Sequence, residues 1–240
     1  MTINLRNAAI LGAGLGSRLK SLTHSKPLLE LQGMSLLSRT MNNLKEQNFS
    51  KIHCALREEL LSAEDKNKLP QSPNIHYLFK NTESSLHTLG ELIHSMEPND
   101  KTLPEHLFIT MADTILHQKD LTAFVAFCRN LEPEENAILT TPYIRDEKPL
   151  VVKLDSQNIV SSFGEAAKEN SLVTSGIYCF SPLALSLVNP SINQGMHKMR
   201  NFLAHLVEKN QKIRGFVVEK TIDIDHPEDI DDALRFLGKA

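Results

Sequence analysis

Short apolar runs alternate with stretches of helical periodicity along the first half of the chain. The apolar runs are Ala8–Leu11, Ile52–Leu56, Ile75–Phe79, Leu107–Ala112 and Ala137–Thr141. The helical spacing occurs in Ser35–Gln47, Glu58–Lys68, Ser84–Met96 and Gln118–Leu131. Strands that alternate with helices are typical of a parallel sheet covered by helices. The sequence therefore predicts an α/β fold, with a Rossmann-like, mixed but mostly parallel sheet and helices on both faces.

The pattern changes after residue 142. Three strand candidates lie close together there: Leu150–Leu154, Ile159–Phe163 and Leu172–Phe180. A helix from about Gly195 to Asn210, a strand over Ile213–Val218 and a helix after Pro227 complete the chain. We interpret residues 1–240 as a single domain, with a core of residues 1–142, an elaboration of residues 143–210 and a closing strand and helix in residues 211–240.

Composition excludes several classes of protein. The formal net charge is −3, with no run of Lys and Arg and no Trp, so we expect no nucleic-acid partner. No apolar run approaches the ~20 residues of a membrane span, so we expect no membrane partner. Cys54, Cys128 and Cys179 have neither metal-site nor disulfide-framework spacing, which favours a cytoplasmic location.

A glycine-rich turn follows the first apolar run. Gly12, Gly14 and Gly16 alternate with other residues there. Glycines let backbone N–H groups approach a ligand closely, and successive N–H groups form a concavity that suits phosphate oxygens. Arg18 and Lys26 add two positive charges. This pattern predicts a site for a polyphosphate such as a nucleoside triphosphate.

Other interpretations of this turn stay open. A Rossmann dinucleotide fingerprint has a third Gly or Ala where this chain has Ser17, and Pro27 interrupts the helix that should follow. The spacing of the Walker pattern is absent. A purely structural glycine turn is a further alternative.

Three acidic residues suggest a metal site. Asp113 ends the run LFITMAD, at the sheet edge where the glycine-rich turn also leaves its strand. A carboxylate that faces phosphates needs a cation between them, and Mg²⁺ prefers oxygen ligands. Asp113 could equally be a turn residue. Asp223 and Asp225 lie two apart in TIDIDHPED and point the same way if that segment is extended, whereas Pro227 starts a helix.

Taken together, these motifs resemble the sugar-phosphate nucleotidyltransferases and MobA-like NTP transferases. The residues are GAGLGSRL at 12–19, then Thr23, then KPLL at 26–29. LFITMAD resembles the strand that ends in the metal-binding Asp, and LVTSGIYCFSP the strand beside the acceptor. NTESSLHTLGEL resembles the nucleoside segment of the inositol-phosphate and phosphocholine cytidylyltransferase branches. TIDIDHPEDI resembles the closing metal-site motif.

The resemblance implies a role for each matching residue. It implies catalytic roles for Arg18 and Lys26. The implied nucleotide-binding residues are Leu11, Gly12, Ala13, Gly14, Gly16, Ser17, Ser84, Ser85 and Thr88. The implied acceptor residues are Gly164, Glu165 and Gly176, and the implied Mg²⁺ ligands are Asp113 with Asp223 or Asp225.

The resemblance also implies an activity. We expect Mg²⁺-dependent transfer of a nucleotidyl group from an NTP, with CTP or UTP favoured, to a phosphorylated sugar or small alcohol, with release of pyrophosphate. Residues 1–142 would bind the nucleotide and residues 143–210 the acceptor. The alternatives are an NAD(P)-binding Rossmann oxidoreductase, a non-catalytic nucleotide-binding regulatory module and nucleotidylation of a molybdenum cofactor. The sequence leaves a homo-oligomer open.

Overall fold

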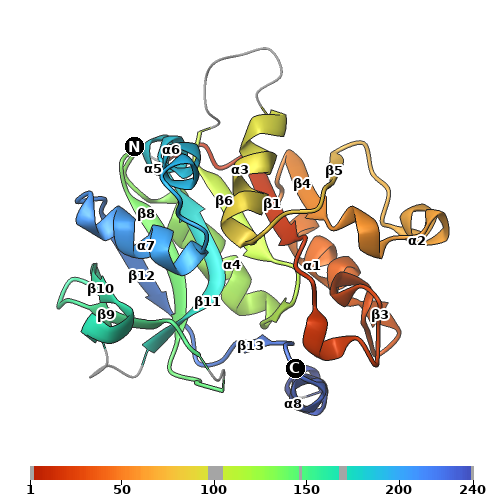
Figure 1. The fold of residues 1–240 in the computed structure, drawn as a ribbon. Coiled ribbons are helices and arrows are strands. Elements are labelled where there is room, and N and C mark those ends of the chain that lie inside the picture. Colours follow the sequence, from red (N-terminus) through yellow and green to blue (C-terminus); the bar gives the residue numbers. More distant parts are fainter. Residues whose placement is uncertain (1–2, 97–104, 146–147, 168–171, 239–240) are drawn as a thin grey trace.

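A nine-stranded sheet forms the centre of the computed structural model, which describes residues 3–96, 105–145, 148–167 and 172–238 (Figure 1). The strands are β1 (Asn7–Gly12), β4 (Lys51–Leu56), β5 (Ile75–Phe79), β6 (Leu107–Met111), β8 (Asn136–Thr141), β9 (Val151–Leu154), β10 (Val160–Phe163), β11 (Leu172–Phe180) and β12 (Ile213–Val217). Strands β6, β1, β4 and β5 are parallel neighbours, and β12 pairs in parallel with β8. Strand β11 is antiparallel to β6, β8 and β9.

Helices cover both faces of the sheet. They are α1 (Leu36–Lys45), α2 (Ala63–Lys68), α3 (Ser85–Met96), α4 (Gln118–Arg129), α5 (Pro182–Ser186), α6 (Val188–Asn193), α7 (Met199–Glu208) and α8 (Pro227–Leu237). Ala8 and Ile10 of β1 belong to one buried cluster with α1 and α4, and Ala9 and Leu11 to another with α3, α5, α6 and α7. Successive strand residues point to opposite faces, so both faces of β1 are apolar because both are covered. This arrangement confirms the predicted fold class.

A third apolar cluster holds α8 against the start of the chain. It joins Leu19 and Leu29 to Ile222, Ile224 and Phe236. Two short ladders lie beside it: β2 (Glu30–Leu31) pairs with β3 (Met34–Ser35), and β7 (Thr114–Ile115) pairs with β13 (Ile222–Asp223). This cluster brings the closing segment of the chain next to the glycine-rich turn.

Several predicted elements differ in extent from the structure. The predicted helix over residues 58–68 is wrong: it is a 3₁₀ turn, η3 (Glu58–Leu60), followed by α2, which starts after the capping residue Ser62. A serine side chain that accepts the first backbone N–H groups starts a helix there. The helix expected from Gly195 begins only at Met199. Helices α5 and α6 were not predicted, although Ser181 and Pro182 mark the start of α5.

Strand β11 changes neighbours at a glycine. Its first residues, Leu172 and Val173, pair with β9, whereas Ile177 to Phe180 pair with β6. Gly176 lies between these two parts with φ +67°, and the register against β8 shifts there. Positive φ is accessible to Gly at little cost, and such an irregularity bends a strand. The bend is next to Met111 and Thr114, at the end of β6.

Candidate active site

The glycine-rich turn and Asp113 meet at the carboxyl ends of β1 and β6. The two strands are in register, with Leu11 opposite Met111, so the segments that follow them leave the sheet side by side. A cavity of about 360 Å³ lies at this edge. Its lining includes Leu11, Gly12, Gly14, Gly16, Ser17, Arg18, Lys26, Asp113 and Asp225. The structure thus brings nine of the predicted site residues to one cavity.

Each glycine of the turn has a different structural role. A Cβ on Gly12 would lie 2.9 Å from Leu56 Cδ2, so the turn packs closely on the sheet. A Cβ on Gly14 would meet nothing within 4 Å, so this backbone faces open space. Gly16 has φ +55°, and its Cβ would lie 2.8 Å from Lys26 Cβ. The absence of side chains therefore lets residue 26 approach the turn and leaves backbone accessible at residue 14.

Two carboxylates hold the ammonium group of Lys26. Lys26 Nζ forms an ion pair with Asp113 Oδ2 and another, at 2.6 Å, with Asp225 Oδ1. The lysine side chain is only 11% exposed. Burial alone would lower the pKa of Lys26, but the charges of Asp113 and Asp225 outweigh it and raise that pKa above its ordinary value. Lys26 is therefore a fixed positive charge at this edge.

Asp223 lies beside this ion pair. The β7–β13 ladder places it opposite Thr114, whose hydroxyl donates a 2.7 Å hydrogen bond to Asp223 Oδ1. Asp223 is exposed to solvent and lines the wall of a cavity. Partial desolvation by the cavity wall, together with the charge of Asp113, raises the pKa of Asp223 above its ordinary value. Asp113, Asp223 and Asp225 thus place three carboxyl groups beside the ammonium group of Lys26.

The start of α8 fixes Asp225. The backbone N–H of Asp225 donates a hydrogen bond to Asp229 Oδ2 at 2.9 Å, and the backbone N–H of His226 donates to the same oxygen at 2.7 Å. The turn before Pro227 is thereby held so that Asp225 contacts Lys26. Burial would raise the pKa of Asp225, but the charge of Lys26 and its hydrogen bond lower it. The expectation that residues 227–229 begin a helix, leaving Asp223 and Asp225 for the site, agrees with this geometry.

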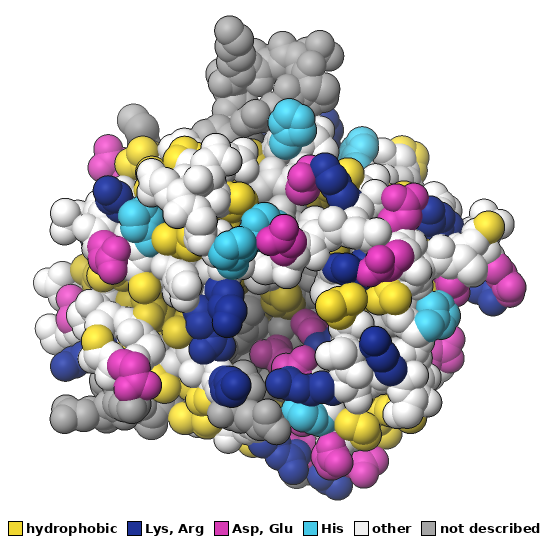
Figure 2. Space-filling model, viewed as in Figure 1, with side chains coloured by type: hydrophobic (Ala, Val, Ile, Leu, Met, Phe, Trp, Pro, Cys, Tyr) yellow, Lys and Arg dark blue, Asp and Glu magenta, His cyan; other side chains and the backbone are white. Residues whose placement is uncertain are grey.

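A second cavity, of about 330 Å³, adjoins the first and shares Met111 and Asp225 with it. Tyr143, Arg145, Lys198 and Arg200 contribute to its wall, with Asp223 on the acidic side. Figure 2 shows a hollow on this face of the molecule where Lys and Arg side chains gather beside Asp and Glu side chains. The cavity therefore has a basic wall opposite acidic residues.

The structure treats the three predicted acceptor residues differently. Gly176 lines the second cavity, as expected for a residue that touches the acceptor. Gly164 and Glu165 instead begin the 3₁₀ turn η4 (Gly164–Ala167) that follows β10. Neither is among the described residues that line this cavity. Gly176, which belongs to the motif LVTSGIYCFSP, thus lies at the second cavity. Gly164 and Glu165 do not line it.

A third cavity, of about 180 Å³, contains the other predicted nucleotide residues. Ala13, Ser84, Ser85 and Thr88 line it together with Arg57. Arg57 Nη1 donates to Thr82 O at 2.8 Å and to Ala13 O at 3.3 Å, so the guanidinium ties the glycine-rich turn to the segment before α3. Leu11, Gly14 and Met111 line both this cavity and the first. The three cavities are therefore parts of one continuous site.

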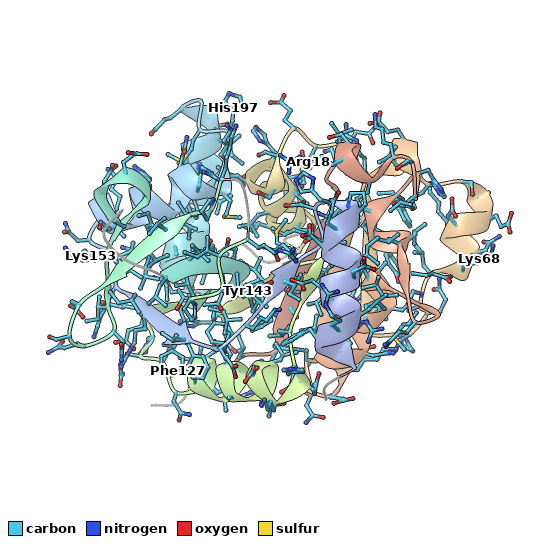
Figure 3. All side chains as sticks on the ribbon, turned by 90° about the horizontal axis from the view of Figure 1, so that it is seen from below. Arg18, Lys68, Phe127, Tyr143, Lys153 and His197 are labelled. Carbon is cyan, nitrogen blue, oxygen red and sulfur yellow. The ribbon has the colours of Figure 1, made fainter. Side chains whose placement is uncertain are left out.

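Sequence reasoning missed the basic residues of the site that lie outside motifs. Arg57 follows β4, Arg145 follows β8, and Lys198 and Arg200 lie at the start of α7. Figure 3 shows Arg18 and His197, the neighbour of Lys198, toward one side of the molecule and Phe127 of α4 at the opposite side. Of these four residues, only Arg57 could have been found from the sequence, because it follows an apolar run that ends at the same sheet edge as Asp113.

The sequence was also compared with protein-family models. The model described as Nucleotidyl transferase matches residues 7–239. The chain belongs to the nucleotidyl transferase family. The resemblance noted in the sequence is confirmed at this level, and the chain is a nucleotidyltransferase by family. A search of curated proteins finds no match.

Solved structures with a similar fold include three proteins that are named as nucleotidyl transferases or as a nucleoside-diphosphate-sugar pyrophosphorylase. The inositol-1-phosphate CTP transferase from T. maritima has 15% identity and a TM-score of 0.75, covering 100% of this chain and 99% of the other. A protein from Bacillus anthracis described as a glucose-1-phosphate thymidylyltransferase has 16% identity and a TM-score of 0.78, covering 97% and 95%. The nucleoside-diphosphate-sugar pyrophosphorylase from Vibrio cholerae has 14% identity and a TM-score of 0.67, covering 95% and 99%.

These neighbours share the α/β architecture of the chain over nearly its full length. They confirm the fold class. In the part of the chain that the structure describes, no helix combines the length and apolar character needed to cross a membrane.

Proposed function

We propose that this nucleotidyltransferase couples an NTP, with CTP or UTP favoured, to a phosphorylated sugar or small alcohol and releases pyrophosphate. One observation carries the proposal: the glycine-rich turn, Lys26, Asp113 and Asp225 line a single cavity. This excludes the arrangement that would have contradicted it, in which Lys26 and Asp113 open onto different sides of the molecule. The preference for CTP or UTP rests on the resemblance of residues 81–92, and the acceptor class on the basic wall of the adjoining cavity.

The residues at the sheet edge fit a hard divalent cation. Asp113, Asp223 and Asp225 supply carboxylate oxygens, and their negative charge exceeds what Lys26 neutralises. Lys26 pairs with both Asp113 and Asp225, so this contact does not separate the two carboxylates. We assign Asp113 and Asp223 as the ligands of Mg²⁺, because Asp113 is the acidic neighbour that acts most strongly on Asp223 and the ladder of β7 and β13 holds their segments together. Bound there, Mg²⁺ would supply positive charge to the triphosphate oxygens.

The chain's own residues position the two anionic substrates. Backbone N–H groups of residues 12–17 hold the triphosphate, while Arg18 and Lys26 neutralise its oxygens. Arg145, Lys198 and Arg200 bind the phosphate of the acceptor. The cavities adjoin at Met111 and Asp225, so an acceptor oxygen can reach the α-phosphorus. It forms a bond to that phosphorus, the bond to the bridging oxygen breaks, and pyrophosphate leaves with the electron pair.

No covalent intermediate with the protein is needed, because the acceptor phosphate is already an anionic nucleophile. The contribution of the protein is therefore orientation of two reactants and stabilisation of charge on the departing oxygens. Lys26 is suited to the second task because its ammonium group stays protonated and is held in place by two carboxylates.

A screen for pyrophosphate release tests this function. Each of four NTPs is combined with Mg²⁺ and a panel of phosphorylated sugars, polyols, choline and aminoalkylphosphonates. Release that requires both an NTP and one acceptor class supports the proposal. Binding of NAD(P) without Mg²⁺-dependent release would instead support the oxidoreductase alternative, and NTP binding with no release under any combination would support the regulatory module.

Two further expectations accompany this proposal. The chain acts on small molecules rather than on nucleic acid or membranes, and it is cytoplasmic, which agrees with three buried cysteines that form no disulfide. The division into a nucleotide-binding core, an acceptor-side elaboration and a closing segment stays an interpretation.

A further inference from the structure

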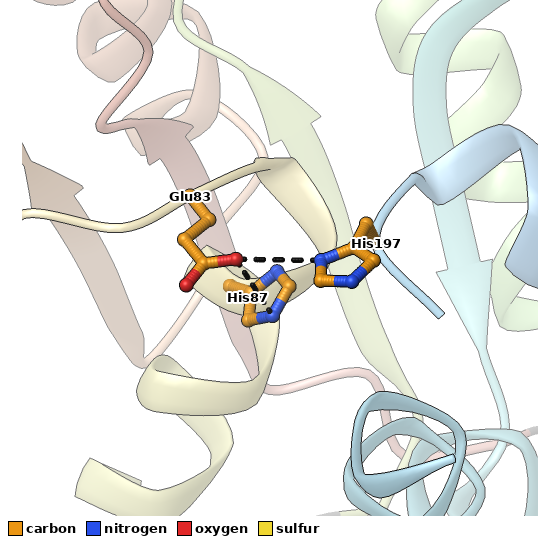
Figure 4. A group of neighbouring side chains, drawn as sticks. All are labelled: Glu83, His87 and His197. Atoms are coloured by element: carbon orange, nitrogen blue, oxygen red, sulfur yellow. Dashed lines mark ion pairs between the residues drawn. The ribbon is translucent and has the colours of Figure 1, made fainter. Parts of the chain in front are cut away.

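Glu83, His87 and His197 converge at the rim of the site, away from the carboxylates at the sheet edge (Figure 4). Glu83 precedes α3, His87 lies in its first turn, and His197 lies just before α7. Glu83 Oε2 is 3.3 Å from His197 Nδ1 and 3.8 Å from His87 Nε2. One ligand atom from each residue lies within 4.8 Å of the other two.

These separations suit direct coordination. An ion bound at about 2.0–2.2 Å from each nitrogen and oxygen holds its ligand atoms roughly 3–3.5 Å apart in a tetrahedral site. The two distances from Glu83, 3.3 and 3.8 Å, are close to this range, and the two histidine nitrogens lie within 4.8 Å of each other, so rotation of the histidine rings brings the three ligand atoms to coordination distance. Glu83 and His197 are largely exposed, with 73% and 64% of their side-chain surface accessible, so an ion can enter from solvent.

A hydrogen bond orients one imidazole for coordination. Ser84 Oγ lies 2.9 Å from His87 Nδ1. When Nδ1 carries the proton and donates it to Ser84 Oγ, the lone pair of Nε2 faces Glu83. A histidine that binds a metal through one nitrogen generally donates a hydrogen bond from the other. The arrangement therefore goes beyond a pair of exposed ion pairs, which by themselves contribute little to stability.

We propose that Glu83, His87 and His197 form a binding site for one transition-metal ion of the Zn²⁺ type. Two imidazoles and one carboxylate suit Zn²⁺ and its neighbours Co²⁺ and Ni²⁺, whereas Mg²⁺ prefers oxygen ligands alone. Three protein ligands leave a fourth position for water or an anionic group of a substrate. This site is separate from the Asp113 and Asp223 pair assigned to Mg²⁺.

The ion would join two walls of the substrate cavity. Ser84 and Ser85 line that cavity next to Glu83 and His87, and Lys198 lines it next to His197. A bound ion thus ties the start of α3 to the segment before α7. Ser84 contacts both the His87 ring and the cavity, so it links the metal to the substrate site.

Cobalt binding tests the site without any activity assay. The full chain is freed of metal with a chelator that is then removed, and Co²⁺ is titrated while the visible absorption of four-coordinate Co²⁺ is recorded. We expect one equivalent to bind in the presence of excess Mg²⁺, and Zn²⁺ to displace it. We expect His87→Ala and His197→Ala to abolish the absorption band, and Ser84→Ala to weaken binding by about 10–100-fold.

Two histidine variants are matched controls. His24 forms a 2.9 Å pair with Asp65 but with no third ligand among the described residues, and His76 stacks on His53 with ring centroids 5.2 Å apart. His24→Ala and His76→Ala should bind Co²⁺ as the unmodified chain does. An unchanged titration in His197→Ala, loss of binding in His76→Ala, or no stoichiometric binding to the unmodified chain would each overturn the proposal. None of these outcomes depends on the nucleotidyltransferase reaction.

Discussion

Replacing Lys26 by Met separates the role of its charge from the role of its packing. Methionine keeps an unbranched apolar side chain of similar length, so contacts beside Gly16 are retained, but it removes the ammonium group that pairs with Asp113 and Asp225. The two carboxylates then face the cavity without their cation. We therefore expect a large loss of activity with a much smaller loss of stability.

The magnitude follows from the geometry. Removing one preorganised charge partner of a transition state commonly costs ~10²–10³ in turnover, which is about 2.7–4 kcal/mol of activation free energy. The folding cost is smaller because Asp225 is 40% exposed and both carboxylates can be hydrated from the cavity. Loss of one hydrogen bond to a charged group costs about 1.5–3 kcal/mol, and Lys26 makes two such contacts. Hydration of the two carboxylates and relief of the burial of the ammonium group offset part of this cost, so we expect the free energy of unfolding to fall by about 1.5–3 kcal/mol.

The assay is pyrophosphate release at saturating NTP and acceptor, combined with urea unfolding followed by circular dichroism. Lys20→Met is the control, since Lys20 is an exposed lysine of the same segment that does not line the described cavities. Turnover of Lys26→Met within a few-fold of the unmodified chain and of Lys20→Met would remove Lys26 from the mechanism. Global unfolding of Lys26→Met would contradict the estimate of a modest stability cost.

Three other substitutions give independent checks. Asp223→Asn should raise the Mg²⁺ concentration for half-maximal rate by at least about tenfold, and an unchanged Mg²⁺ titration would contradict its role as a ligand. Gly176→Ala should lower the free energy of unfolding in urea by about 1–3 kcal/mol, because residue 176 has φ +67° and its new Cβ would lie 2.7 Å from Met111 Cγ. An unchanged unfolding midpoint would contradict this and show that β11 relaxes at residue 176. Asp232 accepts a hydrogen bond from Tyr143 and pairs with Arg235, which lowers its pKa below the ordinary value of 3.8. A lowered folded-state pKa stabilises the chain above the unfolded value, so the stability advantage over Asp232→Asn should be full at pH 7 and shrink as the pH falls below about 4; an advantage that is constant down to pH 3 would refute this.

Much of the fold could be predicted because the signals are local. The predicted strands Ile75–Phe79 and Leu172–Phe180 have the same bounds as β5 and β11, since polar or turn-forming residues flank their apolar runs. Helices α5 and α6 were missed because they are short, and Pro190 inside α6 disfavours a helix on local grounds. Helix α3 was predicted from its periodicity even though Gly90 disfavours a helix, and the reason for this glycine is tertiary: its missing side chain lets α3 approach Asn189 and Ile192 of α6. Tertiary packing decides these cases.

The residues of the candidate site also divide into those that local sequence signals predict and those that only the folded chain brings together. Motif residues such as Gly12, Lys26 and Asp113 could be found because their types and spacing carry the chemistry. Arg145 and Arg200 could not, since each is an isolated cation and only the folded chain brings them to one cavity. The proposed choice of Asp223 over Asp225 also needed the structure, because Asp223 and Asp113 are far apart in the chain and are brought together only by the pairing of β7 with β13.

The central claim is that the chain joins a nucleotidyl group to an acceptor phosphate, and ³¹P NMR tests it most directly. A mixture of CTP, Mg²⁺, the acceptor panel and the unmodified chain should show loss of the triphosphate signals, growth of a pair of coupled phosphorus signals from a P–O–P anhydride linkage, and an equal amount of pyrophosphate. The same mixture with UTP tests the second favoured nucleotide. Intact triphosphate with every NTP and every acceptor, or pyrophosphate formed together with free nucleoside monophosphate and no coupled product, would contradict the account.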